Sequence, residues 1–421
     1  MGRTARDKRD LPHPKPVERI ELNTEHTTRR LVLAGVFLVV GILLLAYSFV
    51  KMMSPESEWV NIESSTGGAG NCSSEFTFLY HLSSTGIAAR EEQRDASAIY
   101  TELCKNAYEI FNAREEIEGV NNLWAINRHP NEELAVDPAL YDAFAALEES
   151  GSRMLYLGPV HERYTGTFHC TDDAQLADFD PWSSEAVARE YQAYARYAND
   201  PQSVRLELLG ENRVKLVVSE EYLAFARREE IETLIDFSWM RNGFIVDYLA
   251  RELMERGCER GALTSYDGFV RCMDRTGEKY SLTVYDRRER GVYAAAEVYY
   301  EGPLSAVSLR DHPVNELDEG RFYQTAAGEM RTPYVDLADG FSKASVPDLM
   351  CSSKSRSCVE ILLAMVPVYI ADEFDPAAVD ALAEDDIAGI YCADGVIYAS
   401  GPEPELGQLY QDKTVQYHIA T

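Results

Sequence analysis

The feature that most constrains this chain is an apolar run near its N-terminus, from Leu31 to Val50. The run holds twenty consecutive residues without a charged side chain. A helix of that length rises about 30 Å, which matches the hydrocarbon core of a bilayer. A cleaved signal peptide would carry a shorter apolar region, and a lipoprotein signal would end at a cysteine, whereas the first cysteine is Cys72. We therefore predict a retained, single transmembrane helix over residues 31–50.

The charges on either side of this run predict its orientation. Eight Lys or Arg residues precede it, including Arg29 and Arg30, and only Lys51 follows closely. Because basic residues favour the cytoplasmic side, residues 1–30 are expected to form a cytoplasmic tail. The rest of the chain is then expected to lie outside a cytoplasmic-type membrane.

The part of the chain after the run is strongly acidic. The whole chain has a formal net charge of −30, and because its first thirty residues carry eight basic and five acidic side chains, the remainder carries −33. Such a field repels nucleic acid and anionic lipid. Neither is therefore expected as a partner.

Composition divides the outer part into three segments. Residues 51–75 include a stretch rich in Ser and Gly without hydrophobic periodicity, which predicts a flexible stalk. No internal linker of that kind divides residues 76–404, so we expect one folded domain there. Residues 405–421 are expected to form a C-terminal tail.

All eight cysteines follow the apolar run, and the sequence leaves their state open. An even number on the outer side permits up to four disulfides, and buried free thiols are the alternative. The cysteines are Cys72, Cys104, Cys170, Cys258, Cys272, Cys351, Cys358 and Cys392.

Hydrophobic periodicity and capping residues predict an α+β fold, with helices packed on mostly antiparallel sheets. Helices are expected at Ala96–Phe111, from Pro138 after an Asp137 cap, at Ser183–Ala198, Gly243–Gly257, Ser357–Ala364 and Phe374–Leu382. Hairpins are expected at Val204–Val218, at Gly268–Asp274 with Lys279–Asp286, and around Asp394-Gly395, with a further strand at Val292–Tyr300.

Common catalytic motifs are absent from the sequence. It contains no GxxxxGK phosphate loop, GxSxG elbow, HExxH zinc site or GxGxxG turn. His161, His169, Cys170, Asp172 and Asp173 form the densest run of metal-ligand residue types, but their spacing matches no standard site. Such a run more often faces solvent.

The segment from Asp236 to Asp247, DFSWMRNGFIVD, is more informative. Its Arg241-Asn242-Gly243 step directly precedes the expected helix, where free backbone N–H groups and the positive end of the helix dipole favour an anion such as phosphate. The alternative is that Asn242 only caps the helix.

The order of several segments resembles the ApbE family, the FAD:protein FMN transferases. The region of DFSWMRNGFIVD resembles the family's IDLGGIAKGYAVD segment. The stretch around Asn121, Asn122 and Asn127 resembles the family's Asn-bearing turn, and Gly257–Phe269 resembles its G-x-x-x-ALVN-x-GG segment. The resemblance covers roughly residues 76 to 400.

The resemblance implies an extracytoplasmic domain that binds FAD in a cleft beside Mg²⁺ and passes FMN to a threonine or serine of a partner protein. A membrane or surface flavoprotein is the partner that it implies. The residues that it places at the cofactor are Asn127, Arg241, Asn242, Gly243, Asp247, Gly268 and Ser308.

Four departures fall on the family's catalytic and phosphate-contacting elements. Asn242 stands where the family has a lysine, and Pro333 where it has the histidine of HIxDPxTG. Cys358 and Leu362 stand where it has its Asp and Thr metal ligands, with Glu360 as the one nearby oxygen donor, so Mg²⁺ is doubtful. Ser308-Leu309-Arg310 replaces a T-S-G step. No catalytic residue and no metal ligand is therefore assigned.

Three hypotheses remain. The first is a membrane-anchored, catalytically degenerate ApbE-like protein that binds flavin or assists protein flavinylation. The second is an active FAD:protein FMN transferase with rearranged ligands. The third is an acidic envelope scaffold without a cofactor. Whether the chain is an enzyme is left open by the sequence.

Overall fold

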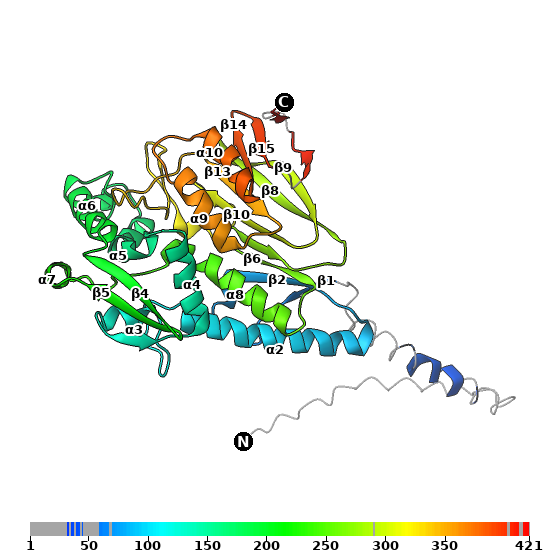
Figure 1. The fold of residues 1–421 in the computed structure, drawn as a ribbon. Helices are drawn as coiled ribbons and strands as arrows, with labels where there is room; N and C mark the ends of the chain where they lie inside the picture. The colour runs from blue at the N-terminus through cyan, green and yellow to red at the C-terminus, as the bar shows by residue number, and fades with distance from the viewer. Residues whose placement is uncertain are drawn as a thin grey trace, which may run out of the picture. The chain divides into compact units, whose positions relative to one another are not determined.

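The computed structural model describes most of the chain (Figure 1). The described residues are 32, 35–37, 39–42, 44, 59–66, 70–288, 291–401, 405–411 and 416–420. Residues 57–421 form one compact unit and residues 1–56 another.

More than half of the predicted transmembrane helix lies outside the described residues. Residues 31, 33–34, 38, 43 and 45–50 are outside them, and the nine described positions of the run are helical. Apolar side chains at these positions are exposed, Phe37 by 68 %. Within the described ranges, no helix has the length and apolarity for crossing a bilayer. The transmembrane helix, its orientation and the cytoplasmic tail stay predictions.

The core of residues 57–421 is built on a nine-stranded sheet with the order β1-β2-β6-β7-β10-β13-β14-β15-β17. Its neighbouring strands are antiparallel, apart from the parallel pair β15 and β17. The strands are β1 (Trp59–Ile62), β2 (Phe76–His81), β6 (Gly261–Ser265), β7 (Phe269–Cys272), β10 (Leu304–Arg310), β13 (Asp348–Ser353), β14 (Ala388–Ala393), β15 (Val396–Ser400) and β17 (His418–Ile419).

Both faces of the central strands are covered, since every residue of β10 and β13 is buried. Alternate residues of β10 face different clusters: Val307 and Leu309 join the main core, whereas Leu304 and Ala306 join a separate one. Helices α8 and α9 pack on the first face, and strand β8 packs against β13 and β14.

Three smaller sheets complete the fold: β16-β9-β8, β3-β5-β4 and β11-β12. Their strands are β3 (Glu133–Ala135), β4 (Val204–Gly210), β5 (Arg213–Val218), β8 (Lys279–Arg288), β9 (Gly291–Glu301), β11 (Tyr323–Gln324), β12 (Met330–Arg331) and β16 (Glu405–Leu409).

The α-helices lie against one face of the main sheet and around the small sheet β3-β5-β4 (Figure 1). They are α2 (Gly86–Ile110), α3 (Leu123–Arg128), α4 (Pro138–Glu149), α5 (Gly158–Tyr164), α6 (Glu185–Asn199), α7 (Glu220–Arg228), α8 (Arg241–Glu255), α9 (Cys358–Tyr369) and α10 (Pro376–Ala381). The described residues also form short 3₁₀ turns: η1 (Ser73–Glu75), η2 (Met154–Leu157), η3 (Thr165–His169), η4 (Gln175–Asp178), η5 (Ser238–Met240), η6 (Glu319–Arg321) and η7 (Leu382–Asp385).

The predicted α+β class is confirmed, together with elements that carry strong local signals. Asp137 caps α4 by accepting a hydrogen bond from the Ala139 N–H, and Ser357 forms a capping box with Glu360 at the start of α9. The hairpins β4–β5 and β14–β15 are both present. Capping and hairpin signals are local, which is why they could be interpreted from sequence.

One predicted pairing is wrong. The segment at Gly268–Asp274 was expected to form a hairpin with Lys279–Asp286, but β7 pairs with β6 and β10, and β8 pairs with β9. The chain bends at Thr276 between the two segments, and the bend carries it from the nine-stranded sheet into a different sheet. Turn-forming residues indicate where the chain changes direction, but they do not determine which strand the next segment pairs with.

The structure also corrects two predicted boundaries. The predicted stalk, residues 51–75, contains the strand β1 and the buried Cys72, so the sheet begins before Phe76. The predicted tail, residues 405–421, adds β16 beside β9 and β17 beside β15. Edge strands of two to five residues are too short to show a clear alternation of apolar and polar residues. Their main-chain hydrogen bonds to a single neighbouring strand define them instead.

The eight cysteines are all within the described residues, and all are free thiols, seven of them buried. The sequence left open whether these cysteines form disulfides or stay as buried free thiols, and the structure has free thiols. Burial raises the pKa of Cys272 to about 11 and that of Cys392 to about 12. These thiols are protonated and act as small apolar side chains.

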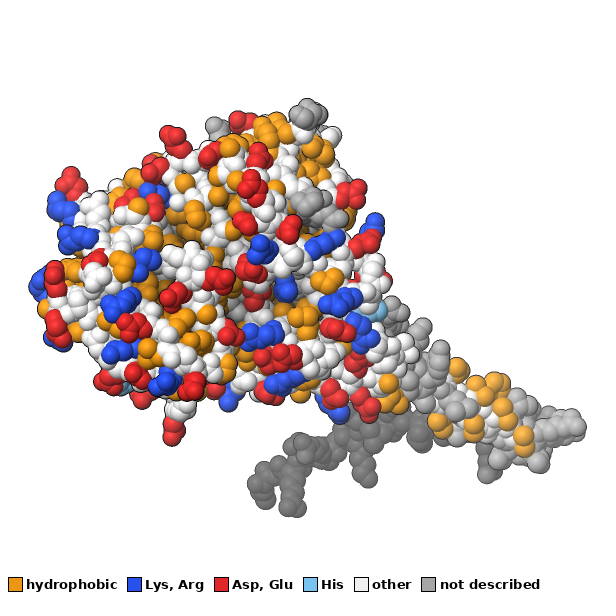
Figure 2. All heavy atoms as spheres, viewed as in Figure 1, with side chains coloured by type: hydrophobic (Ala, Val, Ile, Leu, Met, Phe, Trp, Pro, Cys, Tyr) orange, Lys and Arg blue, Asp and Glu red, His pale blue; other side chains and the backbone are white. Residues whose placement is uncertain are grey.

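Figure 2 shows acidic and basic side chains interspersed over the face that it presents. The large negative charge of the chain is thus not gathered into one patch on this face.

Candidate functional site

A cavity of about 770 Å³ lies where segments from several parts of the chain meet. Its wall includes the end of α2 and the loop after it, α3, α5 with η3, the segment leading into α8, and the turn after β6. This volume is in the range of pockets that hold a small molecule or a cofactor.

Asn127 supports one side of the cavity. Its side-chain oxygen accepts hydrogen bonds from the Leu234 and Ile235 N–H groups at 2.9 Å each, and its amide donates to the Ile235 carbonyl at 2.9 Å. A buried amide that satisfies three backbone groups holds a strand-like segment in place. Asn127 thus fixes the chain immediately before Asp236.

The next residues enter α8 through an unusual backbone. Asp236 accepts a hydrogen bond from the Ser238 N–H at 3.0 Å, and burial raises the pKa of its carboxyl group. Ser238 has a φ of +50°, in the left-handed region that favours glycine. The turn at this serine is therefore strained.

The first residues of α8 present their side chains at the cavity. Arg241 forms an ion pair with Glu75, and the Asn242 amide donates to the Asp267 Oδ2 at 3.1 Å. The remaining oxygens, Asn242 Oδ1 and Asp267 Oδ1, are buried and have no hydrogen-bond partner among the described residues. The Arg241-Asn242-Gly243 step was expected to precede the helix, but it forms the first turn of α8; Arg241 and Asn242 lie at the cavity, with two unpartnered acceptors beside them.

Arg321, which the sequence analysis did not identify, completes this part of the wall. Its guanidinium lies 3.5 Å from Asp267 and 3.4 Å from Asp318, and its carbon Cζ is 5.7 Å from the centre of the Tyr266 ring. Asp318 is fully buried and also pairs with Arg310 at 3.0 Å. This network reaches the cavity from η6, and no local motif marks it.

His161 and Trp239 add two further buried polar atoms to the lining. The Nε2 of His161 and the Nε1 of Trp239 have no hydrogen-bond partner within the described part of the chain. Burial lowers the pKa of His161 to about 4, so its imidazole is neutral at physiological pH. The His161 run was considered for metal binding, and the structure places His161 and His169 at the cavity but directs Asp173 to Tyr323.

Four of the predicted cofactor residues do not line the cavity. Gly243 packs on Phe269, where an added Cβ would lie 2.9 Å from the ring, and at Gly268, which has a φ of +107°, an added Cβ would lie 2.3 Å from the Ser308 carbonyl oxygen. Ser308 donates to Asp348 at 2.8 Å. These residues hold the sheet and α8 together.

Asp247, the fourth, caps α9. Its two carboxylate oxygens accept from the Cys358 N–H at 3.1 Å and the Val359 N–H at 2.9 Å. Burial raises the pKa of this carboxyl group. The residue therefore links two helices and lies away from the cavity.

The positions that depart from the family have clear structural roles. Pro333 lines the cavity. The Cys358 thiol is buried and donates to the Val270 carbonyl at 3.2 Å, and Leu362 is fully buried. Glu360 completes the capping box and pairs with Arg356 at 3.2 Å. A protonated thiol, an aliphatic side chain and a capping carboxylate do not fit Mg²⁺, which requires several oxygen donors.

Across the described ranges, no group of three or more His, Cys, Asp or Glu residues is arranged to hold a metal ion.

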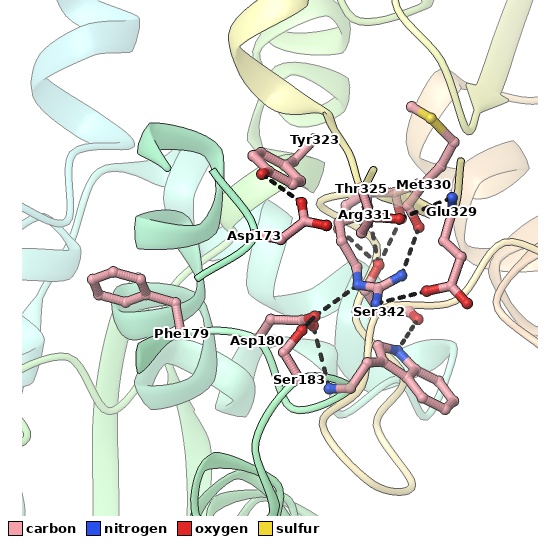
Figure 3. Close-up of polar contacts among 12 residues, drawn as sticks. Asp173, Phe179, Asp180, Ser183, Tyr323, Thr325, Glu329, Met330, Arg331 and Ser342 are labelled. Carbon is pink, nitrogen blue, oxygen red and sulfur yellow. Dashed lines mark hydrogen bonds and ion pairs between the residues drawn. The ribbon is translucent and has the colours of Figure 1, made fainter. Parts of the chain in front are cut away.

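A polar cluster holds residues 173–183, which follow η3 in the chain (Figure 3). Asp180 is fully buried and accepts from Arg331 Nε at 2.8 Å, and Asp173 accepts from the Tyr323 hydroxyl at 2.8 Å. The indole N–H of Trp182 donates to the Ser342 carbonyl at 3.1 Å. The first two contacts join residues 173–183 to the hairpin β11–β12, and the third joins Trp182 to Ser342.

Two solved structures share this architecture. The ApbE protein from Thermotoga maritima is similar with a TM-score of 0.51 and 14 % identity, over 79 % of this chain and 93 % of that chain. The flavin transferase ApbE from Vibrio cholerae, solved as a histidine-to-glycine mutant, is similar with a TM-score of 0.53 and 14 % identity, over 82 % of this chain and 98 % of that chain.

No protein-family model and no curated protein matches the sequence. The structural likeness shows that the chain has an ApbE-like fold, as its segments had suggested.

Proposed function

We propose that this protein is a membrane-anchored, extracytoplasmic flavin-binding protein with an ApbE-like fold, in which the transferase reaction is lost. The observation that carries the proposal is the cavity at the start of α8, where Arg241, Asn242 and Asn127 come together with buried polar atoms that lack partners. The similarity to a flavin transferase supports flavin as the ligand.

The residues present fit a flavin in chemical character. Trp124, Phe168 and Trp239 supply aromatic surface for a planar ring, and Asn242, Asp267 and His161 supply buried polar atoms to orient it. Leaving a buried polar group without a partner costs about 1–3 kcal/mol, so a ligand that hydrogen-bonds these atoms gains that free energy on binding. FAD, when bound, would supply the FMN group of the transfer reaction.

The same structure argues against the transfer step. Phosphoryl-type transfer requires neutralisation of the diphosphate charge, usually by a metal ion, and a group that positions or deprotonates the attacking hydroxyl. Pro333 has no proton acceptor on its side chain, and Cys358 and Leu362 provide no oxygen ligand. The protein would therefore retain the ligand without acting on it, and would serve a membrane or surface flavoprotein as a binding partner.

The test is flavin binding by the purified full-length chain in mild detergent, with and without Mg²⁺, followed by quenching of flavin fluorescence. We expect saturable binding that does not depend on Mg²⁺, and no covalent FMN on a threonine-bearing acceptor peptide by mass spectrometry. Mg²⁺-dependent binding with FMN transfer would instead establish an active transferase. No binding of any flavin would leave the scaffold hypothesis.

A further inference from the structure

The arginines of the cavity are largely neutralised by carboxylates. Six Asp or Glu residues and four Arg residues line it. Arg128 pairs with Glu232 at 2.6 Å, Arg241 pairs with Glu75, and Arg321 lies between Asp267 and Asp318. Among the described residues of the lining, the exposed Arg114 is the arginine without an ion-pair partner within 4 Å. A diphosphate would have to compete with carboxylates already in place.

The side chains at the start of α8 reinforce this polarity. Asn242 and Asp267 present two buried oxygens, Asn242 Oδ1 and Asp267 Oδ1, and the two arginines beside them, Arg241 and Arg321, are each paired with a carboxylate. Oxygen acceptors are satisfied by N–H or O–H donors and repel the oxygens of a phosphate. The pair therefore favours a ligand group that donates hydrogen bonds.

We infer that this cavity selects an uncharged flavin of the riboflavin class over a flavin diphosphate, with Asn242 and Asp267 accepting hydrogen bonds from the ligand. The inference rests on the proposed function, because it names the form of flavin that the same cavity takes. Riboflavin carries a ring N–H and several hydroxyl groups, which supply the required donors, and it has no phosphate to oppose the carboxylates.

Calorimetry with riboflavin, FMN and FAD, in the absence of divalent cations, tests the inference on the full-length chain. Riboflavin is expected to bind at least as tightly as FAD. A preference of the wild-type protein for FAD of about tenfold or more would overturn the inference and leave flavin binding intact. Failure of all three flavins to bind would overturn the proposed function itself.

Two variants separate the contributions. Asn242→Lys adds a cation at the cavity and is expected to shift the FAD-to-riboflavin preference towards FAD by about tenfold. Asn61→Lys adds the same charge on the exposed position of the edge strand β1 and is expected to leave the preference unchanged. Equal shifts in both variants would contradict a local effect at the cavity.

Asp267→Asn keeps the size of the side chain and replaces one acceptor oxygen by a donor. It is expected to weaken riboflavin binding by about tenfold and to weaken FAD binding less. This variant also serves if Asn242→Lys fails to fold, which thermal unfolding would reveal. Unchanged riboflavin affinity in a folded Asp267→Asn protein would overturn the role assigned to the acceptor pair.

Discussion

At the scale of single residues, Asp247 and Asp137 both accept hydrogen bonds at helix N-termini but differ in how many of their carboxylate oxygens accept one. Asp247 gives one oxygen to each of two N–H groups of α9, whereas Asp137 uses one oxygen for the Ala139 N–H of α4. Asparagine has one oxygen and an NH₂ group, so it can replace Asp137 but must set a donor against an N–H at Asp247.

We expect Asp247→Asn to lower the free energy of unfolding by about 1–3 kcal/mol. The matched control, Asp137→Asn, should change it by less than about 0.5 kcal/mol, because Asn and Asp cap helices equally well. Urea unfolding followed by circular dichroism measures both. Equal losses in the two variants would show that the second hydrogen bond of Asp247 contributes nothing.

His161 predicts a pH dependence of stability. Burial lowers its pKa to about 4 in the folded protein, against about 6.5 in the unfolded chain. Below pH 6.5 the unfolded chain binds a proton that the folded protein does not, so the stability from this group is lost as the pH falls towards 4. Between pH 7 and pH 5 the loss is about 2 kcal/mol.

The change His161→Phe should remove that loss, so that the variant's unfolding free energy falls less than the wild type's between pH 7 and pH 5. His169→Phe, at an exposed position of the same cavity, is the control and should follow the wild type. Urea titrations at the two pH values provide the comparison. Parallel behaviour of His161→Phe and wild type would refute the assignment.

At the scale of elements, a buried ion pair attaches the hairpin β11–β12 to residues 173–183. Arg331 is largely buried and pairs with Asp180, which is fully buried (Figure 3). The exposed pair between Arg213 and Glu133 joins β5 to β3 instead. Both pairs join a guanidinium to a carboxylate, but the first is buried and the second is exposed. Loss of the arginine should therefore change the free energy of unfolding by different amounts in the two pairs.

Arg331→Met would leave Asp180 as an uncompensated buried charge, and we expect a loss of about 3–5 kcal/mol. Arg213→Met should cost less than about 1 kcal/mol, as is usual for exposed pairs. Urea unfolding measures the losses, and limited proteolysis should show faster cleavage within residues 173–183 in Arg331→Met alone. A small loss in Arg331→Met would mean that the hairpin is held by its other contacts.

At the scale of the whole molecule, the apolar run before the folded unit predicts attachment to a membrane. After expression in a bacterial host, the full-length chain should stay in the membrane pellet when the membranes are washed with alkaline carbonate. Replacing both Val39 and Val40 by Arg interrupts the run at its middle, at about 2.5–3.5 kcal/mol for each charge. That variant should move to the supernatant, whereas release of the wild-type chain would contradict the anchor.

Local signals made part of this fold predictable. The cap at Asp137, the capping box at Ser357 and the turn at Asp394-Gly395 act through residues a few positions apart. The segment Asp236–Asp247 could likewise be proposed as part of a candidate site, because a polar step near the start of a helix is visible in the sequence. Arg241 and Asn242 do lie at the cavity.

Long-range packing decided the rest. Residues far away in the sequence determine the partners of β7 and the strands near both ends of the folded unit. They also determine the roles of Gly243, Asp247, Gly268 and Ser308. The same holds for the cavity itself, where Asn242 meets Asp267 and Arg321. The sequence by itself determined the apolar run, the α+β class and the local elements, because periodicity and capping act within a few residues. Only the tertiary structure decided which of its polar groups share one cavity, because their charges and hydrogen bonds become paired across elements that meet on folding.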